Sequence, residues 1–157
     1  AMVFHAARDI APGQEACIAY KETACSCAVR QAALKKAFNF ECACERCSLD
    51  GEARERSDRL RQEFAQLDKR LMQVDCEPHA ALEMVDRMLE VIDVEFENDP
   101  SKAADAYYEG FQIALSAGFV EIARSMVQKA YEARFLAEGD HEGTREWKES
   151  AELAAGS

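Results

Sequence analysis

The feature that most constrains this chain of 157 residues is a cluster of three cysteines, in the segment ECACERC at positions 41–47. A CxxC spacing lets one tight turn present two sulfurs to one ion, and the CxC before it adds a third sulfur. We therefore predict that Cys42, Cys44 and Cys47 bind zinc. The chain is then expected to fold around a short metal-binding knuckle.

A structural zinc ion is usually held by four thiolate or imidazole ligands in a tetrahedron, so three cysteines leave one position open. Cys25 and Cys27 form a second local pair that either completes the site or consists of small buried side chains without a metal; we favour the second interpretation. The full set of candidates for the fourth ligand within this sequence is Cys17, Cys25, Cys27, Cys76 and His5.

The cysteine content and the first residues together indicate a reducing compartment. The chain has 7 cysteines, an odd number, and its beginning, AMVFHAARDI, has no basic segment followed by an apolar one. Metal binding is therefore favoured over a disulfide framework, and we expect an intracellular protein of the nucleus or cytoplasm. No run of eighteen apolar residues is present, so we expect no membrane-spanning helix.

The excess of negative charge lies entirely in the second half of the chain. The net charge is −11; residues 1–76 carry 12 basic and 12 acidic side chains, whereas residues 77–157 carry 7 and 18. Such a half repels nucleic acid and attracts a basic partner, such as a lysine-rich tail. Solvated helix faces are the simpler interpretation of the same charges.

The first part of the chain predicts two short strands and a helix. Strands are expected at Val3–Phe4 and at residues 16–20, with a turn at residues 11–13 between them. Residues 28–38 follow as a helix, because Val29, Ala33 and Ala37 share one face.

From Arg54 onward the sequence predicts helices joined by short loops. Leu60, Phe64, Leu67 and Leu71 recur at helical spacing, and Pro78 then interrupts the pattern. Later boundaries are expected from an Asp99 cap before Pro100 and from left-handed glycines, with helices at about 120–136 and 144–153. Short loops force antiparallel neighbours, so we expect tetratricopeptide-like helical hairpins, although no clean 34-residue repeat is present.

Two segments carry a family resemblance. RDIAPGQEACIAY and RQAALKKAFNFECACERC resemble the end of a SET domain and the post-SET zinc module that follows it, as in SET and MYND proteins and the related SET proteins common in fungi. The family pattern is RDI-x-x-GEE-x-x-x-SY, a helix of the form R-x-x-x-L, then F-x-C-x-C-x-x-C. The match covers residues 3–47, and the helical remainder, with AYYEGFQIALSAG and ARFLAEGDHEG, is similar to the helical C-terminal domain of these proteins.

The resemblance implies a fold and a division of the chain. The expected fold is mainly α: a short β-hairpin remnant of a SET domain, the zinc knuckle, and the helical hairpins. Residues 1–41 would be the C-terminal end of the SET domain, residues 42–51 the post-SET knuckle, and residues 52–157 the helical C-terminal domain.

The resemblance also implies an activity. Family members transfer a methyl group from S-adenosylmethionine to a protein lysine, often on histones. Tyr20 stands at the position of the catalytic tyrosine, which also lines the cofactor site, and Phe40 at that of an aromatic residue that packs against the cofactor. Gln14 and Ala19 depart mildly from the pattern. The glycine-rich cofactor strand and the asparagine-histidine-serine-cysteine segment, which supplies the fourth zinc cysteine, would lie upstream of residue 1.

The sequence therefore leaves three interpretations of the function. The first is the C-terminal portion of a SET-type protein-lysine N-methyltransferase, inactive as this chain alone. The alternative is a non-enzymatic acidic helical interaction module with a zinc staple; a zinc-stapled structural fragment without activity is a third reading. The expected partner is a protein substrate or a basic peptide such as a histone tail, and neither nucleic acid nor a membrane is expected.

Overall fold

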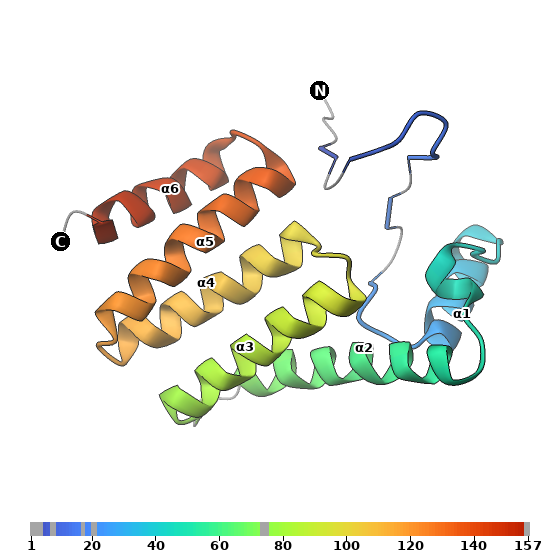
Figure 1. Ribbon diagram of the computed structural model, residues 1–157, viewed down its shortest axis with the longest axis horizontal. Helices are drawn as coiled ribbons and strands as arrows, with labels where there is room; N and C mark the ends of the chain where they lie inside the picture. Colours follow the sequence, from blue (N-terminus) through green and yellow to red (C-terminus); the bar gives the residue numbers. More distant parts are fainter. Residues whose placement is uncertain (1–4, 7–8, 17, 20–21, 73–75, 156–157) are drawn as a thin grey trace. The chain divides into compact units, whose positions relative to one another are not determined.

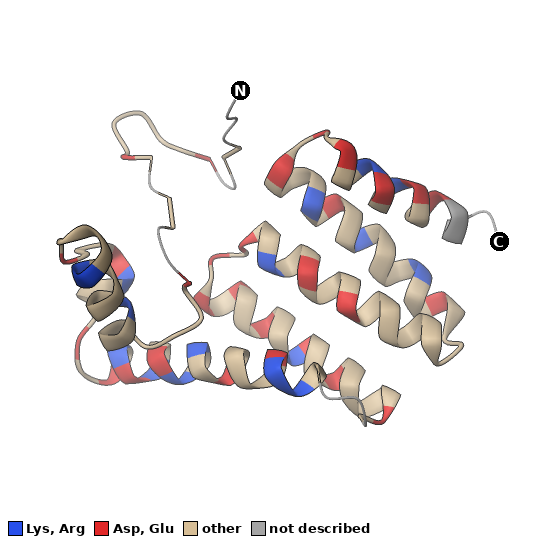
Figure 2. Cartoon of the chain, turned by 180° about the vertical axis from the view of Figure 1, so that it is seen from behind, with Lys and Arg blue, Asp and Glu red and all other residues tan. Residues whose placement is uncertain are grey.

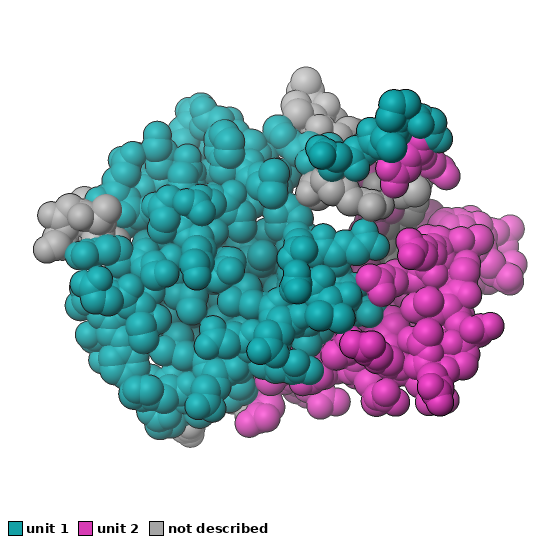
Figure 3. Space-filling model, viewed as in Figure 1, with its two compact units in different colours: residues 1–13, 73–157 teal, residues 14–72 magenta. Residues whose placement is uncertain are grey.

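The computed structural model describes residues 5–6, 9–16, 18–19, 22–72 and 76–155. All regular structure in these ranges is helical, with six α-helices and one short 3-10 helix and no strand (Figure 1). The expectation of a mainly α protein is thus confirmed. The chain divides into two compact units, residues 14–72 and residues 1–13 with 73–157 (Figure 3), which are described separately below.

The predicted β-hairpin is not formed in the part of the chain that the structure describes. Pro12 and Gly13 do form the expected turn, but residues 9–11, 14–16, 18 and 19 belong to no strand. Ile10 and Ile18 are 48% and 57% exposed, so no layer covers an apolar face of a hairpin. A two-stranded hairpin without such a cover is marginally stable at best. Val3, Phe4, Cys17 and Tyr20 lie outside the described residues.

The unit of residues 14–72 contains α1 (Cys27–Phe38), the 3-10 helix η1 (Glu45–Ser48) and α2 (Gly51–Leu71). The predicted helix over residues 28–38 is confirmed. The Ser26 side chain accepts a hydrogen bond from the Val29 N–H at its start, and Asn39 adopts a left-handed conformation (φ 55°) at its end. Each feature satisfies backbone groups that a helix end leaves unpaired.

Hydrogen bonds tie α2 to the segment that begins α1. The Asp58 carboxylate accepts a bond from the Cys27 N–H at 2.7 Å, and Arg61 Nη1 donates to the Thr23 carbonyl at 2.6 Å. Arg61 is buried, as is Phe64 one turn further along. Of the four apolar residues that recur at helical spacing in α2, only Phe64 is buried. Polar contacts therefore help to decide which side of α2 faces α1.

The second unit contains α3 (Pro78–Glu95), α4 (Pro100–Ser116), α5 (Val120–Glu138) and α6 (Glu142–Ala155). Each of these helices packs against the next one in the chain (Figure 1). The short connections make neighbours antiparallel, as expected. None of the helices in the described ranges is both long and apolar enough to span a membrane.

Local signals set the ends of these helices as predicted. The Asp99 carboxylate accepts hydrogen bonds from the N–H groups of residues 101 and 102, and Pro100 occupies the first helical position. Gly118 (φ 76°) and Gly139 (φ 72°) follow α4 and α5 in conformations that favour glycine. The last helix begins at Glu142, two residues before the predicted start.

Small residues let these helices approach closely. Ala104, Ala106 and Ala114 on α4 are at most 1% exposed, as are Val127 and Ala130 on α5. A β-carbon at Gly110 of α4 would lie 3.2 Å from Val85 Cγ1 and 3.3 Å from Met126 Sδ, so the glycine leaves room for both neighbouring helices.

Gly110→Leu should destabilise this unit by about 1–3 kcal/mol, because the larger side chain overpacks the contact with Val85 and Met126. Thermal unfolding followed by circular dichroism measures the change. Gln112→Leu, at an exposed position on the same helix, is the matched control and should change the stability by less than about 0.5 kcal/mol. Equal melting temperatures for both variants would contradict the packing described here.

Candidate metal centre

The three predicted cysteines lie together. The sulfurs of Cys42, Cys44 and Cys47 are all within 4.8 Å of one another. Ligands on a tetrahedral zinc ion, with Zn–S bonds of about 2.3 Å, stand roughly 3.8 Å apart. The donor set and its spacing therefore fit one thiophilic metal ion. Cys47 is buried, Cys42 is half-buried and Cys44 is exposed, so the cluster is open on one side.

Gln31 of α1 fixes the backbone of Cys42. Its Nε2 donates to the Cys42 carbonyl at 2.7 Å, and its Oε1 accepts from the Cys42 N–H at 2.8 Å. One side-chain amide thus pairs with both backbone groups of a ligand residue, as a neighbouring strand would. This pair of hydrogen bonds, the Gln31 clamp, fixes the position of the Cys42 backbone relative to α1.

The turn η1 brings Cys44 and Cys47 to the same side. A 3-10 helix has three residues per turn, so residues three apart point the same way. The Ser48 N–H donates to the Cys44 carbonyl at 2.9 Å, and the Ser48 hydroxyl donates to the Ala43 carbonyl at 3.1 Å. This local geometry is the physical reason for the CxxC spacing.

Cys47 is held from both helices of its unit. Arg54 of α2 donates through Nη2 to the Cys47 carbonyl at 2.8 Å and through Nε to the Leu49 carbonyl at 2.6 Å. Arg30 of α1 donates through Nη2 to the Cys47 sulfur at 3.8 Å. The Cys27 thiol donates to the Cys47 carbonyl at 3.9 Å. Cys47 is therefore the most firmly positioned of the three ligands.

The three cysteines shift one another's pKa values. A hydrogen bond to the Cys44 backbone lowers the pKa of Cys42, but burial and the Cys44 and Cys47 side chains raise it overall, to about 11. Burial raises the pKa of Cys44, but the backbone N–H of Cys47 and bonds from the Cys42 and Cys47 thiols outweigh burial and lower it. A metal ion that binds here must displace thiol protons.

Cys25 and Cys27 do not join the cluster. No fourth cysteine, histidine or carboxylate lies within 4.8 Å of all three sulfurs in the described ranges. Cys27 is 1% exposed and packs beside Cys47, which fits the interpretation as a small buried side chain. Burial raises the pKa of both Cys25 and Cys27, so neither is an activated thiol.

The structure describes one of the two residues that the resemblance assigns to catalysis and cofactor binding. Tyr20 lies outside the described residues. Phe40 is half-buried, two residues before Cys42, and its ring lies 6.4 Å from that of Phe38. The catalytic role of Tyr20 and the cofactor contacts of both residues stay predictions, as do the predicted domain boundaries.

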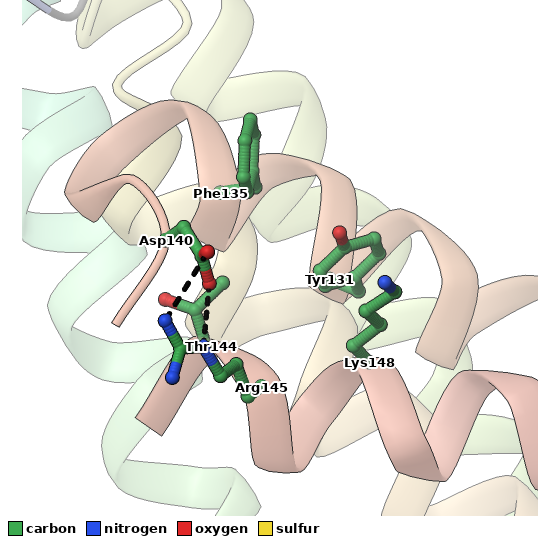
Figure 4. Close-up of a pocket in the computed structure, with 6 residues that line it drawn as sticks. All are labelled: Tyr131, Phe135, Asp140, Thr144, Arg145 and Lys148. Atoms are coloured by element: carbon green, nitrogen blue, oxygen red, sulfur yellow. Dashed lines mark hydrogen bonds and ion pairs between the residues drawn. The ribbon is translucent and has the colours of Figure 1, made fainter. Parts of the chain in front are cut away.

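A second feature is a cavity of about 200 Å³ between α5 and α6 (Figure 4). Arg145 donates to both carboxylate oxygens of Asp140, at 2.8 and 3.3 Å, so its charge is already neutralised. This bond from Arg145 lowers the pKa of Asp140. The remaining lining residues form neither a metal-ligand set nor an activated nucleophile. They are Tyr131, Phe135, Thr144 and Lys148.

Sequence reasoning missed the residues that hold the ligands. Gln31, Arg30 and Arg54 belong to helices and act on cysteines 7 to 17 positions away. The family pattern R-x-x-x-L includes Arg30 and Leu34, which was the one available signal, but a pattern letter alone gives no role.

The full chain should bind about one zinc ion, and Cys42→Ser, Cys44→Ser and Cys47→Ser should each weaken binding strongly, because each removes a ligand. Cys25→Ser and Cys27→Ser are matched controls and should keep the wild-type zinc content. Elemental analysis of the purified proteins, with a colorimetric chelator titration, gives both numbers. Loss of zinc from the Cys27 variant alone would place Cys27 among the ligands.

The fold and the cysteine cluster are the available leads to function. The chain matches no protein-family model and no curated protein.

Proposed function

We propose that this chain is the C-terminal portion of a SET-type protein-lysine N-methyltransferase that uses S-adenosylmethionine. In this proposal Cys42, Cys44 and Cys47 hold a structural zinc ion that joins the end of the SET domain to a tetratricopeptide-like helical domain. The observation that carries it is a contact between two parts of the sequence pattern. Arg30 and Leu34, the R-x-x-x-L residues, are each 7% exposed, and Arg30 contacts the sulfur of Cys47.

The contact gives the pattern a physical basis. The helix α1 bears the arginine and the leucine on its buried side, and it also carries Gln31, which pairs with Cys42. Helix and cysteines therefore form one structural unit rather than two adjacent motifs. A unit of this kind supports the interpretation of residues 28–47 as a post-SET module.

Within the proposal the residues divide the chemistry. The Tyr20 hydroxyl would line the lysine channel and orient the amine for direct displacement of the methyl group, and Phe40 would pack against the cofactor. Most of the rate would come from positioning and electrostatics, not from a covalent intermediate. The rest of the cofactor pocket would be supplied by residues that precede this chain, so the chain alone is expected to bind no S-adenosylmethionine.

Expressed with the residues that precede Ala1 in its gene, the protein should transfer a labelled methyl group to a lysine peptide. Tyr20→Phe should lower the rate by at least about 100-fold, the usual cost of losing one oriented group at a reaction centre. Tyr107→Phe, on α4, is the matched control and should leave the rate unchanged. Calorimetry on the chain alone should detect no S-adenosylmethionine binding; stoichiometric binding would contradict the proposed division of the cofactor site.

A second candidate function, an interaction module for a basic peptide, is favoured by one surface. Four exposed carboxylates recur at spacings of three and four residues along α3, which places them on one face, and a fifth exposed carboxylate follows just beyond the helix. Acidic residues recur along the helices of the four-helix unit (Figure 2). Arg87 is paired with one of the five, at 2.7 Å. We call this set the acidic stripe: Glu83, Asp86, Glu90, Asp93 and Glu97.

A fluorescent lysine-rich peptide should bind the full chain at low salt, and the affinity should fall as the ionic strength rises. The double change Asp86→Asn with Asp93→Asn should weaken binding by about tenfold, as expected when two exposed attractive charges are removed. Glu146→Gln with Glu149→Gln removes the same charge from α6 and is the control. Equal losses for both pairs would mean that only the net charge attracts the peptide.

A further inference from the structure

We propose that Arg30 is the counter-cation of the metal centre, which holds Cys47 as a ligand and offsets the negative charge of the metal–thiolate cluster. This inference rests on the zinc site of the proposed function and deepens it. Arg30 would act through Cys47, so it is a positioning residue rather than a ligand.

The charge of the cluster calls for such a group. Three thiolates around one Zn²⁺ leave a net charge of −1, and a fourth thiolate would make it −2. Burying an anion without a compensating charge or hydrogen bond is costly. Cys47 is 8% exposed, so water does little to stabilise the charge on its sulfur. A cation at this position would therefore strengthen metal binding.

Arg30 is placed to supply that cation. Its side chain is 7% exposed, its Nη1 donates to the Cys25 carbonyl at 2.5 Å, and its Nη2 donates to the Cys47 sulfur at 3.8 Å. No carboxylate pairs with it in the part of the chain that the structure describes.

Arg54 provides a contrast within the same site. Its guanidinium is directed at the carbonyl oxygens of Cys47 and Leu49, and it makes no bond to a sulfur. It therefore fixes the path of the backbone, whereas Arg30 contacts the ligand atom itself. The two arginines separate a structural role from an electrostatic one.

The test compares Arg30→Met, Arg30→Lys and Arg54→Met in the full chain, with zinc affinity measured by chelator competition. Arg30→Met should weaken zinc binding by about 10- to 100-fold, the usual effect of losing an outer-shell partner. Arg30→Lys keeps the cation and should bind at least about tenfold more tightly than Arg30→Met. Thermal unfolding of the metal-free variants measures the purely structural effect, which should be largest for Arg54→Met.

Wild-type affinity in Arg30→Met would overturn the inference. So would an Arg30→Lys variant that binds no better than Arg30→Met, because the loss would then be one of shape and not of charge. A wild-type chain that binds no zinc would contradict the metal centre of the proposed function, and the inference about Arg30 with it. Methyl transfer is measured separately, so the failures can be told apart.

A measurement on the wild-type chain avoids variants that do not fold. In the cadmium-loaded protein, the guanidinium N–H signals of Arg30 should shift and exchange more slowly with water than in the metal-free protein. Signals of Arg54 should change less, because its partners are carbonyl oxygens in both states. Arg30 signals that do not respond to cadmium would overturn the inference.

Discussion

The unit of residues 14–72 depends on three sulfurs confined within 4.8 Å of one another. Like charges this close cannot all ionise without a cation. Burial and the neighbouring cysteine side chains together raise the pKa of Cys42 to about 11, although a hydrogen bond to the Cys44 backbone lowers it. A metal ion removes the conflict by replacing protons with one shared positive charge. The path of the chain from α1 through η1 to α2 is arranged around this cluster, since α1 holds Cys42 and both helices hold Cys47.

The two compact units are stabilised by different means. In the four-helix unit, alanines and one glycine let helices pack closely through apolar contacts. In the cysteine-containing unit, the buried residues of the helices include Arg30, Ser57 and Arg61 beside a few apolar residues. A unit of fewer than about 70 residues with so small an apolar core usually needs a metal or disulfides. The cysteine cluster supplies ligands for such a metal.

The parts of the structure that the sequence predicts are those set by local chemistry. Asp99 before Pro100 and the glycine at 118 act on backbone groups within a few residues, so the helix ends followed from them. The grouping of the cysteines followed in the same way from spacings of two and three residues. The prediction of a hairpin was wrong for the described residues, because strands need a covering layer that local sequence does not specify. The Gln31 clamp and the Asp58 bond to Cys27 span 11 and 31 residues, so only the folded chain reveals them.

The burial of Arg30 bears on the state in which this unit functions. An unpaired buried guanidinium is strongly destabilising, whereas an apolar residue of similar volume at such a position is often neutral or stabilising. Among the described residues, Arg30 donates to a carbonyl oxygen and to the Cys47 sulfur, and it gains little if that sulfur is a neutral thiol, which is a weak acceptor. It gains a charge-assisted hydrogen bond if the Cys47 sulfur is a thiolate. Zinc binds cysteine as the thiolate, so in the proposed zinc site the metal-bound state would be the one that offsets the cost of burying Arg30.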